Sequence, residues 1–177
     1  RGSYKKIIPI ILKNLKISGI IEIFDKPVPT PCLGYLSKYN KDSFFIMITA
    51  SHFNKSFNGF KFFFKGKKLS KIYESKILSS GLIKRNKAAT TNVKYTNGYY
   101  KYQKFLNNKF KITNLKKNIL VDFSYGAASS FKNSINFFKN LKCLNYLYNF
   151  KNINSKCGSN YFKSNLNKKN IIDMILL

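Results

Sequence analysis

The sequence predicts an α/β protein, in which short apolar strands alternate with amphipathic helices. Apolar runs of strand length occur at residues 20–24, 44–49 and 119–123, each bounded by polar residues. Residues 4–17 instead carry apolar side chains at a spacing of three and four, which is typical of one face of a helix. The succession of apolar and amphipathic segments over residues 119–148 indicates a β-α-β unit.

The first helix tolerates Pro9 only in its first turn, and Gly19 is expected to end it. We expect a strand over the β-branched run at residues 20–24, and this strand leads into residues 26–31. Three prolines exclude helix and central strand from this segment. Thr30 is expected to cap a helix that begins at Pro31.

The run at residues 44–49 is short and continuously apolar, so we expect a strand buried on both faces in a parallel or mixed sheet. Asn58 and Gly59 form a turn signal, and residues 60–64 are expected to return as a further strand. Residues 44–49 and 60–64 are therefore predicted to form a hairpin-like pair of strands, with residues 50–59 connecting them.

Residues 69–108 are polar and weakly periodic, which indicates helices and loops, with a helix over residues 99–106. From residue 116 the pattern changes. A buried strand, an amphipathic helix to about residue 141 and a strand over residues 144–148 indicate that a second α/β domain starts here.

The net charge of +27 and the pI of about 10.1 would ordinarily suggest a nucleic-acid partner. Almost all of this charge is lysine, since Arg1 and Arg85 are the only arginines, and the lysines are scattered along the chain. Arginine is the residue expected in a base-reading surface. Lysine also rises with Asn, Ile, Phe and Tyr, whose codons are rich in A and T. We therefore interpret the charge as genome bias and expect no nucleic-acid partner; a basic nucleic-acid-binding module remains the alternative, and it predicts salt-sensitive binding.

Cys32, Cys143 and Cys157 are odd in number and widely spaced, so neither a disulfide framework nor a zinc site is expected. No apolar run approaches the ~20 residues of a membrane helix. The expected setting is a reducing cytoplasm, without a membrane partner.

The candidate reactive residue is Ser51, which follows the buried strand in the sequence Thr49-Ala50-Ser51-His52. α/β proteins place their chemistry at such strand ends. Taken alone, the pair is better explained by a helix-capping serine beside a hydrogen-bonded histidine. Lys61, however, is expected to bring a positive charge back beside Ser51 after the turn. Such a charge suits phosphoryl transfer, because that reaction depends on positioning and charge neutralisation.

Four segments resemble the α-D-phosphohexomutases. Residues 45–52 with residues 58–61 resemble the family's phosphoserine loop, Ser-His-Asn-Pro followed by Asn-Gly-x-Lys. Residues 29–36 resemble its Pro-Thr-Pro segment, and residues 121–127 its Val-Asp-x-x-x-Gly-Ala segment. Residues 152–159 resemble its Asn-Ile-Asn-x-x-Cys-Gly-Ser stretch. The four occur in the family's order and span nearly the whole chain.

The resemblance implies a three-layer α/β/α domain I over residues 1–115, lacking its first strand region, followed by the first part of a similar domain II over residues 116–177. It also implies an intramolecular phosphotransferase that interconverts glucosamine 6-phosphate and glucosamine 1-phosphate through a phosphoserine enzyme and a 1,6-bisphosphate. Lys61-Phe62-Phe63 and the Cys-Gly-Ser stretch favour this phosphoglucosamine mutase branch. The phosphomannomutase/phosphoglucomutase branch is the alternative.

By the same resemblance, Ser51 would be nucleophile and phosphoryl donor, and its phosphate would ligate Mg²⁺. His52 would steady the phosphate or a sugar hydroxyl, and Lys61 would neutralise charge or manage the hydroxyl proton; Lys61 equally fits one more lysine of a lysine-rich chain. Residues expected to bind the substrate or its phosphate are Arg1, Thr30, Asn58 and Gly59.

The chain departs from the family pattern in three places. Phe53 and Asn54 stand where the family has Asn-Pro, and residues 123–125 replace Cys-Ala-Asn. The family's Asp-Gly-Asp-x-Asp-Arg metal loop would follow Leu177, and residues 171–177 begin a strand. We therefore expect an amino-terminal fragment that does not turn over by itself; a degenerate, inactive remnant is the other interpretation.

Overall fold

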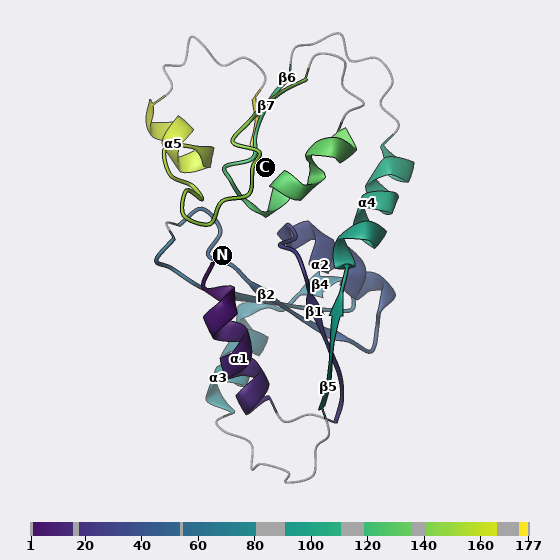
Figure 1. Cartoon of the computed structure of the whole chain (residues 1–177). Coiled ribbons are helices and arrows are strands. Elements are labelled where there is room, and N and C mark those ends of the chain that lie inside the picture. Colours follow the sequence, from purple (N-terminus) through teal and green to yellow (C-terminus); the bar gives the residue numbers. More distant parts are fainter. Residues whose placement is uncertain are drawn as a thin grey trace.

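The structure is a computed structural model that describes residues 2–15, 18–53, 55–80, 91–110, 119–135, 141–165 and 174–176. Helices and strands alternate along these residues, which confirms the predicted α/β class (Figure 1). In chain order the elements are α1 (Tyr4–Asn14), β1 (Gly19–Phe24), α2 (Thr30–Tyr39), β2 (Phe44–Ile48), β3 (Phe60–Phe64), β4 (Lys67–Lys68), α3 (Lys71–Ser79), β5 (Thr91–Thr96), α4 (Gly98–Lys109), β6 (Ile119–Asp122), the 3-10 helix η1 (Ala127–Ile135), β7 (Leu141–Leu144), α5 (Gly158–Asn165) and β8 (Met174–Leu176).

The described strands form three open sheets. β1 and β5 pair in parallel, whereas β2, β3 and β4 form an antiparallel sheet in which Phe44 lies opposite Phe64 and Ile48 opposite Phe60. In the third sheet β6 is central and runs parallel to β7 and β8. Figure 1 shows β6, β7, η1 and α5 at one end of the molecule, with α4 beside η1 and the sheets of residues 19–96 below them.

Two small cores hold these layers. In the first, the inner face of α2, with Cys32, Leu33 and Leu36, packs on Phe63 of β3. In the second, Val121 and Phe123 are almost fully buried. Burying apolar side chains of this size stabilises each core by roughly 1.5–3 kcal/mol per residue.

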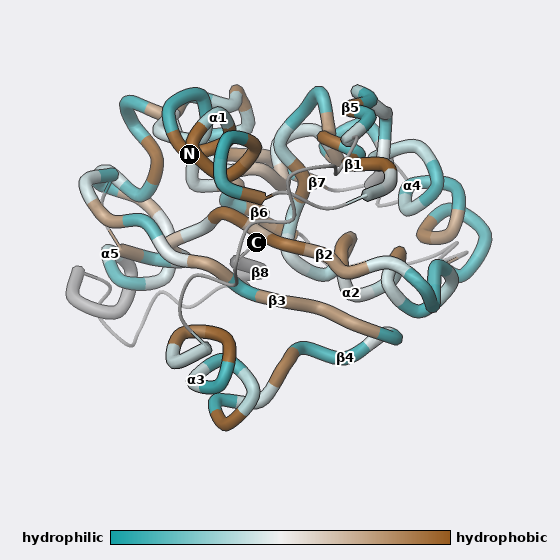
Figure 2. Tube along the Cα trace, turned by 90° about the horizontal axis from the view of Figure 1, so that it is seen from below, coloured by the Kyte–Doolittle hydropathy of each residue, from teal (hydrophilic) through white to brown (hydrophobic). Residues whose placement is uncertain are grey.

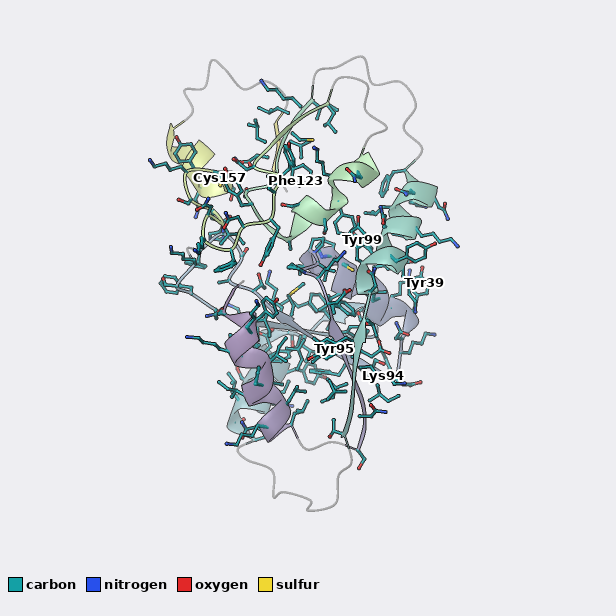
Figure 3. All side chains as sticks on the ribbon, in the orientation of Figure 1. Tyr39, Lys94, Tyr95, Tyr99, Phe123 and Cys157 are labelled. Carbon is teal, nitrogen blue, oxygen red and sulfur yellow. The ribbon has the colours of Figure 1, made fainter. Side chains whose placement is uncertain are left out.

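Aromatic side chains connect the first core to η1. Tyr99 and Tyr102 of α4 meet the Phe131 ring of η1 edge-on, with ring centroids 4.5 and 5.5 Å apart. The Tyr99 hydroxyl also donates to the carbonyl of Ser130, and Figure 3 shows Tyr99 at this junction. The phenol thus keeps its polar end paired while its ring is packed, as buried tyrosines require.

Several predicted elements are confirmed. β1 and β3 fall on the predicted strands, and α4 contains the helix expected over residues 99–106. The β-α-β unit is also present, because η1 connects the parallel strands β6 and β7. β8 lies within residues 171–177, where a strand was expected.

Other details were wrong at the amino-terminal end. α1 ends at Asn14, and Gly19, at φ +142°, opens β1 instead of ending the helix. Pro9 lies inside α1, past the first turn, where it leaves the carbonyl of Lys5 without an amide donor. Thr30 is the first residue of α2 and makes no side-chain cap bond, because Pro29 occupies the cap position.

Three predictions about the strands also need correction. β2 is antiparallel to β3 and only half-buried, with Phe44 49% exposed. β5 was missed, because its polar sequence gains strand character only by pairing with β1. β7 occupies residues 141–144 rather than 144–148, and the helix before it is of the 3-10 type. The proposed domain boundary near residue 116 lies outside the described residues.

Figure 2 shows that apolar residues are concentrated along β2. None of the helices in the described ranges is long and apolar enough to cross a bilayer.

Candidate active site

The Ser51 segment connects β2 to β3. The amide of Thr49 donates to the carbonyl of Gly59 over 2.8 Å, which closes the segment at its base. A Cβ atom at position 59 would lie 2.9 Å from the carbonyl oxygen of Thr49, closer than side chains tolerate. The Asn58-Gly59 pair therefore allows the two strands to approach, as the turn signal predicted.

Ser51 occupies the tip of a tight turn. Its φ of +50° lies in the left-handed region, which costs a non-glycine residue roughly 1 kcal/mol. Its amide donates to Thr49 Oγ1 over 3.2 Å, and the amide of Phe53 donates to the carbonyl of Ala50 over 3.0 Å. The turn leaves Ser51 exposed to solvent at the end of β2.

Aromatic stacking surrounds the neighbouring residues. The exposed His52 ring stacks on Phe53 with centroids 4.8 Å apart and an interplanar angle of 24°. Phe53 in turn meets Phe57 at 5.6 Å. The phenylalanine that stands in place of the family's asparagine thus provides a ring that holds the imidazole plane.

Ser51 lies at a large open cleft with a volume of about 1560 Å³. The cleft is lined by residues from both halves of the chain, among them Thr30, Ser51, His52, Ser124 and Asn154. The structure therefore brings together three of the residues predicted for the site.

The remaining predicted residues lie elsewhere. Lys61 pairs with Met47 and shares the β3 face of Phe63, which packs toward α2. Asn58 accepts a hydrogen bond from the Ser3 hydroxyl. Neither they nor Gly59 line the cleft, and Arg1 lies outside the described residues.

A buried carboxylate organises the other side of the cleft. Asp122, at the end of β6, is 0% exposed. Its Oδ1 accepts from the amide of Ser124 and from Asn145 Nδ2, and its Oδ2 accepts from the amide of Gly158, each over 2.9 Å. These bonds join the loop after β6, the loop after β7 and the start of α5, as a buried carboxylate requires.

Sequence reasoning had quoted Asp122 and Asn154 only as parts of motifs and assigned neither a role. Asn154 Nδ2 donates to the carbonyls of Ser51, over 3.0 Å, and Phe53, over 3.2 Å. The signal available was the co-occurrence of the Asn-Ile-Asn stretch with the serine loop, but no local pattern reveals a contact between residues 103 positions apart.

The residues that the structure describes do not form a Mg²⁺ site. Across the part of the chain that the structure describes, no three His, Cys, Asp or Glu side chains gather where they could hold an ion. Both carboxylate oxygens of Asp122 already accept hydrogen bonds, from three donors in total. Since Mg²⁺ demands near-octahedral oxygen ligation, no reaction step can be assigned to it from these residues.

A buried thiol, Cys157, lies beside Asp122. Burial, and secondly the charge of Asp122, raise the pKa of the Cys157 thiol above its ordinary value. The neutral thiol, which is the weaker nucleophile, is therefore favoured.

Comparison with known proteins places most of the chain among known relatives. Residues 1–88 match the family model described as phosphoglucomutase/phosphomannomutase, alpha/beta/alpha domain I. The phosphoglucosamine mutase of Prochlorococcus marinus (strain MIT 9515) is 34% identical over 160 residues, which cover 84% of this chain and 35% of that protein. That of Ruthia magnifica is 34% identical over 146 residues, covering 75% and 32%. That of Fusobacterium nucleatum is 30% identical over 178 residues, covering 90% and 39%.

The fold and the serine loop thus define an α/β chain with a phosphohexomutase domain I. The chain belongs to the phosphohexomutase family and is most similar to its phosphoglucosamine mutases. It spans about a third of the length of the first two of these relatives.

Proposed function

We propose that this chain forms the phosphoserine-bearing part of a phosphohexomutase and that Ser51 carries the transferred phosphoryl group. The observation that carries the proposal is the position of Ser51, exposed at the tip of a strained turn after β2 and at the cleft. Strained, exposed residues at strand ends are typical of reaction sites.

The proposed reaction moves phosphate between O6 and O1 of glucosamine, the sugar in the names of the relatives. The O1 hydroxyl of glucosamine 6-phosphate attacks phosphorus on phosphorylated Ser51, the bond from phosphorus to Oγ breaks, and the hydroxyl proton passes to Oγ. In the resulting 1,6-bisphosphate, Ser51 Oγ attacks phosphorus on O6, the bond from phosphorus to O6 breaks, and the serine proton passes to O6, which gives glucosamine 1-phosphate and restores the phosphoserine. No oxidant or further reactant is consumed.

The other predicted residues keep their roles as part of the proposal. His52, stacked on Phe53, would steady the phosphate. Lys61 does not line the cleft, so it would supply positive charge from the adjoining strand β3; the remaining binding residues would be Arg1 and Thr30, with Asn58 and Gly59 shaping the turn before β3. Turnover would also require carboxylates beyond those of the described residues, so we expect the 177-residue chain by itself to be inactive or very slow as a mutase.

Mutase activity toward mannose or glucose phosphates is the second candidate, because the matching family model is named for phosphoglucomutase and phosphomannomutase. The names of the curated relatives favour glucosamine. Competition among the three hexose 6-phosphates for the phosphoserine would decide between them.

The test is phosphate transfer to Ser51 from glucosamine 1,6-bisphosphate with Mg²⁺, read by phosphopeptide mass spectrometry. We expect phosphate on Ser51, none in Ser51→Ala, and normal labelling in Ser56→Ala, a matched change at another exposed serine of the same loop. Phosphate absent from Ser51, or spread equally over both serines, would overturn the proposal.

A further inference from the structure

The peptide backbone around Ser51 is held from a distant part of the chain. Asn154 lies in the loop between β7 and α5, and its Nδ2 donates to the carbonyls of Ser51 and Phe53 over 3.0 and 3.2 Å. Asn160 of α5 lies 3.5 Å from the carbonyl of His52, at the limit of a hydrogen bond. Three successive carbonyls of the turn therefore face amide donors of residues 154–160.

Asn154 is itself fixed in place. Its φ of +58° lies in the left-handed region, which asparagine tolerates better than most residues. Its backbone amide donates to the carbonyl of Ser124 over 3.2 Å, and four residues later the amide of Gly158 donates to Asp122. The donor of the two long-range bonds thus belongs to a framework anchored on a buried carboxylate.

The bond to Ser51 fixes a peptide plane. In a trans peptide the carbonyl of one residue and the amide of the next point in opposite directions. When Asn154 holds the Ser51 carbonyl, the amide of His52 is directed to the other side of the turn. Together with the bond from the Ser51 amide to Thr49 Oγ1, this bond restrains the Ser51 backbone on both sides of Cα, and so restrains the region that the hydroxyl can reach.

We propose that Asn154 is a positioning residue for phosphoryl transfer, acting through the backbone of the Ser51 turn rather than by touching the transferred group. This inference rests on the proposed role of Ser51. It assigns to residues 152–158 the task of holding the turn in the strained conformation that presents the hydroxyl. Pre-organisation of this kind raises transfer rate without adding a contact to the substrate.

The decisive variant is Asn154→Asp. Aspartate has the same shape and also tolerates the left-handed region, but its carboxylate only accepts hydrogen bonds and would face two carbonyl oxygens. Asn154→Gly keeps the backbone conformation and removes the side chain. Asn152→Asp is the matched control, since it changes charge equally at an exposed residue of the same loop.

Two measurements are made on each full-length variant: amide hydrogen exchange of residues 50–53, and the initial rate of Ser51 phosphorylation by glucosamine 1,6-bisphosphate. Losing both bonds should raise exchange about tenfold and lower the maximal transfer rate about tenfold, with little change in the concentration for half-maximal rate. Asn152→Asp should match the wild type in both.

Unchanged exchange in Asn154→Asp would show that the bonds do not hold the turn, and faster exchange with an unchanged transfer rate would show that holding it does not assist the chemistry. Either result overturns the inference. A wild type that takes no phosphate would overturn the proposed function and, with it, the catalytic part of this inference, whereas the exchange comparison would still decide separately whether Asn154 holds the turn.

Discussion

Replacing Asp122 by asparagine should destabilise the chain more than any other conservative change at a carboxylate. The side chain is 0% exposed and accepts three hydrogen bonds of 2.9 Å from Ser124, Asn145 and Gly158. Asparagine has the same shape, so the change removes charge and one acceptor without creating a cavity.

The magnitude follows from the geometry. The asparagine oxygen can replace Oδ1 and keep both of its donors, although each bond weakens because the acceptor is no longer charged. The amide nitrogen then faces the amide of Gly158, donor against donor. A hydrogen bond to a charged group contributes about 1.5–3 kcal/mol, so the free energy of unfolding should fall by about 2–3 kcal/mol. Asp122→Ala leaves all three donors unpaired and should cost about 4 kcal/mol.

The assay is urea unfolding followed by far-ultraviolet circular dichroism, with the free energy taken from the midpoint and slope. Asp42→Asn is the control, because Asp42 lies exposed in a turn and its loss should change stability by less than about 0.5 kcal/mol. If Asp122→Asn is as stable as this control, the three bonds do not stabilise the fold and the reasoning is refuted.

Two further predictions concern backbone strain and a buried thiol. Gly158→Ala should cost about 1–2 kcal/mol in urea unfolding, because φ is +79° and the new Cβ would lie 2.9 Å from Ser124 Oγ; no loss of stability would contradict the close approach. Burial raises the pKa of the Cys32 thiol from 9.0 to about 12, so between these pH values the thiol is neutral in the folded chain and ionised in the unfolded chain. The stability that this thiol contributes is therefore fully present below pH 9 and is lost as pH rises toward 12. The stability advantage of the wild type over Cys32→Ala should therefore shrink by up to about 1.4 kcal/mol per pH unit above pH 9, and an advantage that stays constant would contradict the shift.

Local patterns predicted much of the fold. β1, β3 and β6 were found because each is a short apolar run between polar residues. β5 was missed for the complementary reason: it is polar and largely exposed, and only its parallel register with β1 makes it a strand. Pairing partners separated by some 70 residues leave no trace in a local window.

The residues of the candidate site also fall into those that a local pattern indicates and those that only the folded chain brings together. Ser51 could be chosen as a candidate, because a hydroxyl that closely follows an apolar strand is a local feature. The roles of Asp122 and Asn154 could not, because each acts through side-chain bonds to residues brought near only by the folded chain. The same holds for Lys61: its spacing from Ser51 suggested proximity, but strand alternation directs it to the α2 face with Phe63.

The departures at residues 53–54 and the Asn154 bonds bear on one question, the rigidity of the Ser51 turn. A proline at position 54 would restrict that backbone locally, and this sequence has asparagine there. Within the turn, the amide of Ser51 donates to Thr49 Oγ1 and the amide of Phe53 donates to the carbonyl of Ala50, and both bonds join residues two or three positions apart. A left-handed serine persists only when its surroundings over-determine its conformation. Because local covalent restraint is reduced here, the long-range bonds from Asn154 must carry a larger share of that task, and their removal should affect this turn more than one that retains the proline.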